Sequence, residues 1–216
     1  MKKLIILLFI CISFTKVCAQ NINQKDNEGK RDGLWIVNYP NTNQIKFEGT
    51  FKHGKEVGKF KFYKKGITEN PSAIMNFETG SDSVKITYYS QKSEIISEGM
   101  MLNKKRAGKW ITYHNGTDQV MQKEFYKNDK LEGTQTTYYR DGKKAEVTEY
   151  RNGLKNGKSQ IFSTEGQLLQ KLNYKDGQIH GHVTFYNADG DFVAEGDYAN
   201  GERIKDRDSK NQPKNN

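Results

Sequence analysis

GTQTTYYRDGKKAEVTEYRNGLKNG, residues 133–157, contains the two patterns that decide the fold. Asp141-Gly142 and Asn152-Gly153 are pairs that supply the positive φ angles of tight hairpin turns. The residues from Thr134 to Tyr139 are β-branched, aromatic or polar, which is typical of a half-buried strand. The stretch therefore predicts two strands, one tight turn between them and another after them.

The same pattern recurs along the chain. When the sequence is stacked on this stretch, glycines align as anchors with spacings of 25, 50, 25, 24 and 24 residues, at Gly33, Gly58, Gly108, Gly133, Gly157 and Gly181. Because 50 is twice 25, the long gap predicts a degenerate unit centred on Ser83. Five residues after each anchor the first unit has Asn38 and the others have an aromatic residue, namely Tyr63, Tyr88, Tyr113, Tyr138, Phe162 and Tyr186. We therefore expect residues 84–89 to form a strand that pairs with the neighbouring units.

A further column seven residues before the anchor is aromatic or apolar, at Phe51, Met101, Tyr126, Tyr150, Tyr174 and Tyr198. With two turns in each unit, the sequence predicts an all-β fold, an elongated antiparallel β-meander of about seven hairpin repeats with about 14 strands. At about 4.8 Å between strands the sheet is expected to be on the order of 65 Å long, and each unit contacts mainly its neighbours. Pro71 predicts a widened loop or an edge in residues 66–79.

Strand alternation assigns the aromatic residues to two faces. Tyr63, Tyr88, Tyr113 and Tyr138 are expected on one face, and the other is expected to carry Trp35, Val37, Phe60, Phe62, Trp110, Ile161 and Phe185. Two interpretations follow. The rings pack on one another along the columns as cross-strand ladders, or part of a column is a recognition surface. The candidate surface is Tyr63, Tyr88, Tyr113, Tyr138, Phe162 and Tyr186.

The first 19 residues have the order of a secretory signal. Lys2 and Lys3 precede the apolar run at 4–14, and Val17-Cys18-Ala19 predicts cleavage before Gln20. Lipid attachment at Cys18 is the alternative. The predicted organisation is a signal at 1–19, a short lead at 20–28, a repeat array at 29–204 and a polar, disordered tail at 205–216. An exported chain of this kind would be periplasmic, bound to the outer envelope or extracellular.

Composition and charge argue against a nucleic-acid partner, a transmembrane segment and disulfide bonds. Removal of Lys2, Lys3 and Lys16 with the signal lowers the formal net charge from +9 to +6, and acidic and basic residues are interspersed, so no nucleic-acid partner is expected. No apolar run after the signal approaches the roughly 18 residues of a membrane span, so no transmembrane segment is predicted. Both cysteines, Cys11 and Cys18, lie in the signal, so the fold is expected to be held by sheet hydrogen bonds and aromatic packing instead of disulfides.

No constellation of residues indicates catalysis. His180 and His182 lie two apart and could share a strand face, but a metal site needs three or four ligands, and His53 and His114 belong to distant units. Glu165 and Asp189 occupy turn positions, where polar side chains satisfy the backbone. We therefore expect a protein that is not an enzyme and that has no metal or cofactor.

The units GTQTTYYRDGKKAEVTEYRNGLKNG and GHVTFYNADGDFVAEGDYANG resemble MORN repeats, in the variant found in bacterial proteins labelled YwqK-type antitoxins. The resemblance covers about residues 29–203 and is weakest around 64–97. It implies an elongated single sheet and a role in holding proteins together or contacting lipid, with no reaction. The expected function is that of an exported, non-enzymatic protein-binding or scaffolding module of the bacterial cell envelope, with another protein or an envelope component as partner. Neutralisation of a toxin and contact with envelope lipid or carbohydrate are the alternatives.

Overall fold

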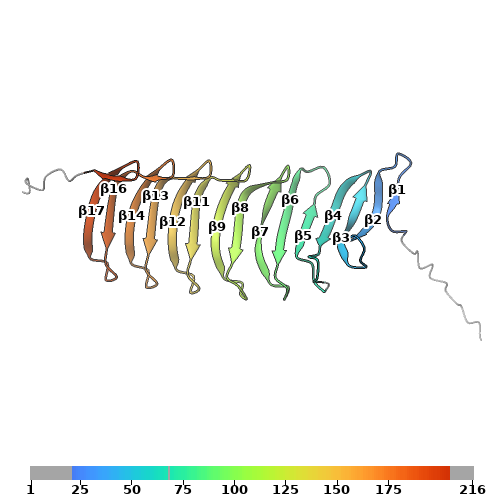
Figure 1. The fold of residues 1–216 in the computed structure, drawn as a ribbon, viewed down its shortest axis with the longest axis horizontal. Coiled ribbons are helices and arrows are strands. Elements are labelled where there is room, and N and C mark those ends of the chain that lie inside the picture. The colour runs from blue at the N-terminus through green and yellow to red at the C-terminus, as the bar shows by residue number, and fades with distance from the viewer. Residues whose placement is uncertain (1–20, 68, 205–216) are drawn as a thin grey trace, which may run out of the picture.

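The structure, a computed structural model, describes residues 21–67 and 69–204, so the predicted signal and tail lie outside the described residues. These residues form one open antiparallel sheet in which each strand pairs with its neighbours in the chain, and they contain no helix. Figure 1 shows the strands side by side along one long axis, from β1 to β17. The strands are β1 (Gln24–Lys25), β2 (Arg31–Asn38), β3 (Ile45–Lys52), β4 (Lys55–Phe62), β5 (Ala73–Phe77), β6 (Ser83–Tyr89), β7 (Ile95–Leu102), β8 (Lys105–Tyr113), β9 (Val120–Lys127), β10 (Lys130–Leu131), β11 (Gly133–Tyr138), β12 (Lys144–Arg151), β13 (Leu154–Phe162), β14 (Leu168–Lys175), β15 (Gln178–Ile179), β16 (Gly181–Tyr186), β17 (Phe192–Ala199) and β18 (Glu202–Ile204).

The predicted all-β meander is confirmed. β10 and β11 both pair with β9, and β15 and β16 both pair with β14, so each of these pairs is one interrupted row. If each pair is counted once and the short end strands β1 and β18 are set aside, the described residues form 14 rows. This equals the strand number that the turn spacing predicts.

The Asx-Gly turns have the left-handed backbone that their sequence predicts. φ is 51° at Asn152 and 88° at Gly153, and the Gly153 N–H donates a 2.8 Å hydrogen bond to the Leu131 carbonyl of the preceding row. The next turn repeats this bond, from Gly177 N–H to the Lys155 carbonyl. The turns therefore extend the hydrogen-bond ladder between rows beyond the strands themselves.

The anchor glycines also have a left-handed backbone, and at Gly58, Gly108 and Gly157 a register shift leaves the anchor unpaired with the preceding strand. At Gly133 the row is interrupted between β10 and β11. Their φ angles range from 65° to 115° at Gly33, Gly58, Gly108, Gly133, Gly157 and Gly181. Residues other than glycine rarely adopt this conformation, so the repeat requires glycine at these positions.

The degenerate unit exists, but its register is one residue later than the sequence spacing predicts. β6 pairs with β5 and β7, which confirms the strand at residues 84–89. Each anchor glycine pairs with the residue that lies seven positions before the next anchor. Gly108, for example, pairs with Tyr126. In this unit Val84 pairs with Met101, and Gly58 pairs with Phe77, so Val84 replaces Ser83 as the anchor equivalent. The β5–β6 pairing is regular at Val84, so no glycine is needed there.

The widened connection after β4 is shorter than predicted. Pro71 lies between β4 and β5, where it removes no ladder hydrogen bond. Residues 73–77, however, form β5 and pair on both sides, with β4 and β6. The expectation of a loop or edge through residue 79 is therefore wrong for the β5 segment, which is an interior strand.

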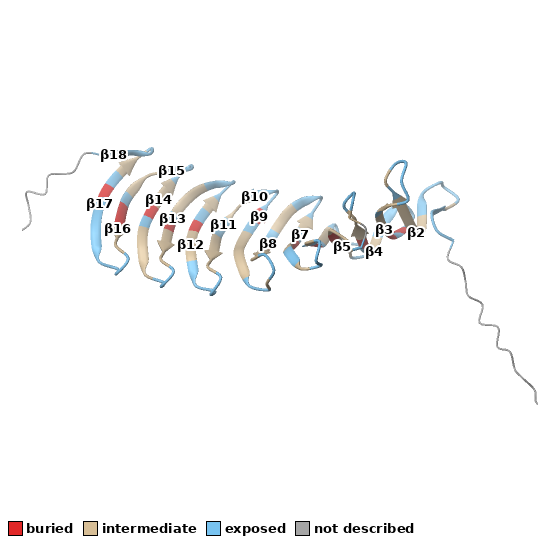
Figure 2. Ribbon diagram, turned by 60° about the horizontal axis from the view of Figure 1, so that its bottom comes forward, coloured by how far each residue is buried: buried red, intermediate tan, exposed pale blue. Residues whose placement is uncertain are grey.

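One face of the sheet, called the ladder face below, carries the central residue of every row, which is glycine in β3, β7 and β17. Cross-strand pairing places Phe60 opposite Met75, Ile86 opposite Gly99, and Gly99 opposite Trp110. Figure 2 shows that buried segments lie in the middle of the strands, whereas the turns at both edges are exposed. The ladder face comprises Trp35, Phe51, Phe60, Met75, Phe77, Ile86, Tyr88, Met101, Trp110, Glu124, Tyr126, Gln135, Thr148, Ser159, Leu172 and Val183 with their same-face neighbours.

Aromatic rings on the ladder face pack against rings of the neighbouring strands. The Phe60 side chain is 2% exposed, and its ring centroid lies 5.1 Å from those of both Phe51 and Phe77. A second cluster is formed by Ile86, Trp110 and Tyr126. In the rows from β9 to β13 the centre of the ladder is polar, and Thr148 and Ser159 share a buried 2.6 Å hydrogen bond, whereas β14 and β16 again carry buried apolar residues, Leu172 and Val183. The aromatic part of the core is therefore concentrated in the N-terminal and central rows.

Candidate recognition surface

Two of the predicted surface tyrosines use their hydroxyl groups within the sheet. On the face opposite the ladder face, Tyr63 donates to Glu48 Oε1 at 3.0 Å and Tyr113 donates to Glu98 Oε1 at 2.8 Å. Each glutamate also forms an ion pair with a lysine. Lys61 Nζ lies 2.7 Å from Glu48 Oε1, and Lys85 Nζ lies 3.0 Å from Glu98 Oε2. These phenols are therefore engaged in cross-strand contacts inside the array.

The charges of these groups are coupled. The hydrogen bond from Tyr113 lowers the pKa of Glu98, while burial, with the Glu98 hydrogen bond second, raises the pKa of Tyr113 to about 12. Since this pKa is raised above the ordinary phenol value, the stabilisation is present below about pH 10 and is lost as pH rises through about 12.

We expect phenolate absorbance to detect this group directly. Subtracting the alkaline titration of Tyr113→Phe from that of the unchanged chain should leave one phenol that ionises near pH 12. A Tyr113 midpoint near 10, the value of an unperturbed phenol, would contradict the buried contact.

The column of tyrosines does not stack on itself. Tyr113, Tyr138 and Phe162 follow equivalent register shifts in their rows. Equivalent positions lie two strands apart, on the order of 10 Å, which is too far for ring contact. Instead, the Lys123 ammonium lies 5.1 Å from the Tyr138 ring centroid. The prediction of ladders along this column is wrong, because the intervening strand separates its members.

Tyr88 lies on the other face from the one predicted. The register shift falls between Tyr88 and Tyr89, so Tyr89 takes the position of Tyr113. Tyr88 instead lies two residues from Ile86 on the ladder face, where its ring centroid is 6.4 Å from that of Trp110. Its side chain is 38% exposed, so it presents an aromatic surface to solvent.

Tyr88 borders a hollow on the ladder face, called the Trp110 hollow below. The hollow has a volume of about 410 Å³ and is lined by Tyr88, Ser97, Met101, Arg106, Trp110, Thr112, Glu124 and Asp129. Its floor is Trp110, which is 5% exposed and whose indole N–H donates to the Met100 carbonyl. β6, β7, β8 and β9 supply all but one of the lining residues, because cross-strand pairing brings their ladder-face side chains together.

The rim of the Trp110 hollow contains positively and negatively charged side chains. The Arg106 guanidinium lies 3.9 Å from the Tyr126 ring centroid, and its Nε lies 3.5 Å from Asp129. On the other side Glu124 accepts a 2.8 Å hydrogen bond from Gln135. The hollow thus combines a fixed apolar floor with oriented charged groups, an arrangement suited to binding.

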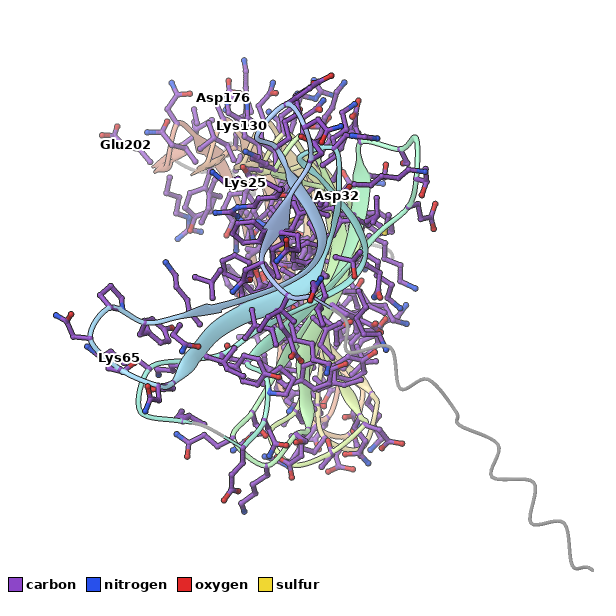
Figure 3. All side chains as sticks on the ribbon, turned by 90° about the vertical axis from the view of Figure 1, so that its right-hand side faces the viewer. Lys25, Asp32, Lys65, Lys130, Asp176 and Glu202 are labelled. Carbon is purple, nitrogen blue, oxygen red and sulfur yellow. The ribbon has the colours of Figure 1, made fainter. Side chains whose placement is uncertain are left out.

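Figure 3 looks along the array and shows side chains standing out from both faces of the ribbon. Asp176 and Glu202, which lie in or after Asx-Gly turns, and Lys130, which follows the Asn128-Asp129 turn, lie toward one edge of the ribbon. Charges of both signs therefore lie along this edge of the sheet.

A set of bonds between units escaped the sequence interpretation. In three units the side chain of the residue six positions after the anchor contacts a backbone carbonyl of the next unit. The Tyr39 hydroxyl donates to the Tyr63 carbonyl at 2.7 Å, and the Tyr139 hydroxyl donates to the Phe162 carbonyl at 2.7 Å. His114 Nε2 lies 3.1 Å from the Tyr138 carbonyl oxygen. The signal was present in the sequence as Tyr39, His114 and Tyr139 at one shared offset.

Of the two histidines considered as metal ligands, His182 has other contacts, whereas His180 Nδ1 is buried with no hydrogen-bond partner among the described residues. His182 lies between Glu195 and Asp197, at 3.3 and 3.1 Å. Asp189 sits in a turn, where its N–H donates to the Asn187 side chain. Within residues 21–67 and 69–204 no group of three or more His, Cys, Asp or Glu side chains is arranged to hold a metal ion. In the same part of the chain no helix is long and apolar enough to span a membrane.

Comparison with known proteins identifies the repeat unit. A search of curated proteins gave no significant match. The family model of the MORN repeat variant matches residues 131–152 and 155–176. The first match spans β10 to β12 and the second lies within β13 to β15, and they begin 24 residues apart, which is the spacing of the anchor glycines here. The chain therefore contains two repeats of the MORN variant, in a sheet whose other rows continue the same hairpin pattern.

Proposed function

We propose that this protein is a non-enzymatic binding module for another protein, and that the partner docks on the ladder face at the Trp110 hollow. The supporting observation is the composition of the hollow, in which an exposed Tyr88 stands beside Trp110, Met101 and Arg106. Trp, Tyr, Met and Arg are enriched at the centres of protein interfaces, and the first two with Arg dominate binding energy. MORN repeats also favour a role in protein binding.

The rigid floor supports this proposal further. Trp110 is held by its indole hydrogen bond and by the Tyr126 ring, whose centroid lies 6.2 Å away. A partner side chain entering the hollow meets groups that are already ordered, so little side-chain entropy is lost on binding. The polar rim of Arg106 and Glu124 supplies one group of each charge for specificity.

The test uses two aromatic residues of similar exposure on opposite faces. Tyr88 is 38% exposed on the ladder face, and Phe125 is 44% exposed on the opposite face. The tagged chain is used to capture partners from the native envelope fraction, and the affinity of the captured protein is then measured. Tyr88→Ala should weaken binding by about tenfold or more, the size of an interface hot spot, while Phe125→Ala should change it by less than about twofold.

Equal binding by both variants and the unchanged chain would contradict the proposal. Loss of binding in Phe125→Ala alone would move the binding surface to the other face. A single tight partner that is toxic when expressed alone would favour neutralisation of a toxin, and loss of surface integrity without any captured protein would favour contact with envelope lipid or carbohydrate.

We also propose that the protein acts after export to the cell envelope. Lys2 and Lys3, the apolar run at 4–14 and Val17-Cys18-Ala19 support this proposal. Mass spectrometry of the protein recovered from its native source should find Gln20 as the first residue. An acyl chain on Cys18 would replace soluble export by membrane anchoring, and an intact Met1 would contradict export by this signal.

A further inference from the structure

The sequence around Trp110 occurs a second time in the chain. Residues 105–111 read KRAGKWI, and residues 30–36, which lie 75 positions earlier, read KRDGLWI. Because 75 is three times the repeat length of 25, the two segments take the same place in their units. Arg31 is therefore the counterpart of the arginine at the rim of the Trp110 hollow, and it lies beside Trp35 on the ladder face.

The Arg31 guanidinium lies on a surface of aromatic rings. It is 4.5 Å from the Trp35 ring centroid, 5.1 Å from that of Phe51 and 5.9 Å from that of Phe47. A further ring, Phe60, adjoins Phe51 with centroids 5.1 Å apart. Contact with three rings restricts the rotamers of this long side chain, so less entropy is lost when its N–H groups bind a ligand.

The two arginines differ in their acidic neighbours. Asp129, whose N–H donates to the Arg106 carbonyl, places its carboxylate 3.5 Å from Arg106 Nε. Its counterpart in the first unit is Gly54, which donates to the Arg31 carbonyl in the same way but has no carboxylate. The first unit therefore keeps the arginine and its aromatic floor and lacks the acid that neutralises the arginine.

Arg31 has no other acidic partner on the ladder face. Glu124, the second acid of the Trp110 hollow, is replaced in the first unit by Gly49. Glu56 lies on the same face, but no ion pair joins it to Arg31. Within the described part of the chain the Arg31 side chain forms no hydrogen bond or ion pair, and it is exposed. Its five N–H donors are therefore accessible to a ligand.

Charge along the array also sets the N-terminal rows apart. Lys155, which occupies the arginine position two units after Arg106, pairs with Glu146 at 3.1 Å. Residues 21–67 carry ten basic and five acidic side chains, a net charge of +5, whereas residues 69–204 carry 18 and 19, a net charge of −1. The field around Arg31 therefore favours a negatively charged group.

We propose that Arg31, on its floor of Trp35 and Phe51, is a second contact point for the protein that docks at the Trp110 hollow, and that it binds a carboxylate of that protein. This inference rests on the proposed function. A guanidinium binds a carboxylate through two parallel hydrogen bonds and stacks on aromatic rings at the same time. β2 and β8 are six strands apart, so the two contact points are separated by about 29 Å along the sheet, the length of about nine extended residues.

Gly54→Asp gives Arg31 the acid that the central unit already has. Asp129 adopts a φ of 66° at the equivalent position, and a Cβ atom at Gly54 would meet its nearest neighbour at 3.4 Å, so the melting temperature should stay unchanged. With the captured protein as ligand, we expect Gly54→Asp to weaken binding by about tenfold. Gly177→Asp adds the same charge at the equivalent turn near the other end of the array and should change the affinity by less than about twofold.

Carbodiimide coupling identifies the anion, because this reagent forms an amide between a lysine amine and a carboxylate, with loss of water. Arg31→Lys keeps the positive charge. In the complex with the captured protein, residue 31 of this variant should be joined to an aspartate or glutamate of that protein, as mapped by mass spectrometry. Arg106→Lys should instead couple to Asp129 within the chain, because the arginine that it replaces lies 3.5 Å from this acid.

The outcomes separate this inference from the proposed function. Unchanged affinity in Gly54→Asp, equal weakening by Gly177→Asp, or no amide between residue 31 and the captured protein would each overturn the carboxylate contact. If Tyr88→Ala still weakens binding in that case, docking at the Trp110 hollow stands without it. If neither Gly54→Asp nor Tyr88→Ala changes the affinity, both proposals are wrong.

Discussion

Phe60→Ala is expected to lower the free energy of unfolding by about 4 kcal/mol, within the range for truncating a large buried aromatic residue. Phe60 is 2% exposed and has ring partners in its own strand and in both neighbouring strands, at Phe62, Phe47, Phe51 and Phe77. A single-layer sheet has no second layer to fill the space that the ring leaves. The loss should appear as a lower denaturant midpoint in chemical unfolding.

Phe125→Ala is the matched control, since it removes the same ring from a side chain that is 44% exposed. We expect it to cost less than about 1 kcal/mol, because little apolar surface returns to water. If the two variants unfold at the same denaturant concentration, the ladder face is not the core of the array.

Gly99→Ala is expected to cost about 3 kcal/mol although it adds a single methyl group. The added Cβ would occupy the space of the Trp110 indole, which is 5% exposed and fixed by its bond to the Met100 carbonyl. The backbone at Gly99 is not left-handed, so the cost is steric and comes from displacing the ring. Overpacking of this kind costs about 1–3 kcal/mol and sometimes more.

Two further variants separate this cause from backbone strain. Gly108→Ala meets no atom within 4 Å but has a φ of 65°, so it should cost about 1–2 kcal/mol through strain alone. In a Trp110→Ala background, Gly99→Ala should become nearly neutral, because the collision is gone. Additive costs for Gly99→Ala and Trp110→Ala would contradict the proposed contact.

The sequence predicts what local turn chemistry determines. Asn152-Gly153 and the anchor glycines need a left-handed backbone that few other residues adopt, so hairpin number and strand number follow from their spacing. The spacing of the turn and anchor glycines does not determine the register of the degenerate unit. The gap from Gly58 to Gly108 is 50 residues whether the middle anchor is Ser83 or Val84, and Tyr88 and Tyr89 are both aromatic.

This one-residue ambiguity explains why the candidate surface was assigned incorrectly at Tyr88. A slip of one residue moves every side chain of a strand to the other face. The sequence prediction therefore assigned Tyr88 and Trp110 to different faces of the sheet and missed the hollow that both residues line. Phe77 could have resolved the register, because only the anchor at Val84 places it in the column of Phe51 and Tyr126. The Asn23 side chain, which accepts from Ile36 N–H and donates to the Ile36 carbonyl beside β2, makes contacts that depend on tertiary geometry and left no pattern in the sequence.

The most direct test of the account is NMR of labelled methionine methyl groups during titration with the captured partner. Met75 and Met101 lie on the ladder face, and Met100 and Met121 lie on the opposite face, so each face carries two reporters. Met101 lines the Trp110 hollow and is adjacent in sequence to Met100. We expect the Met101 signal to shift strongly on binding, while the signals of Met100 and Met121 stay within the line width. Shifts at Met100 and Met121 with an unchanged Met101 would contradict binding on the ladder face.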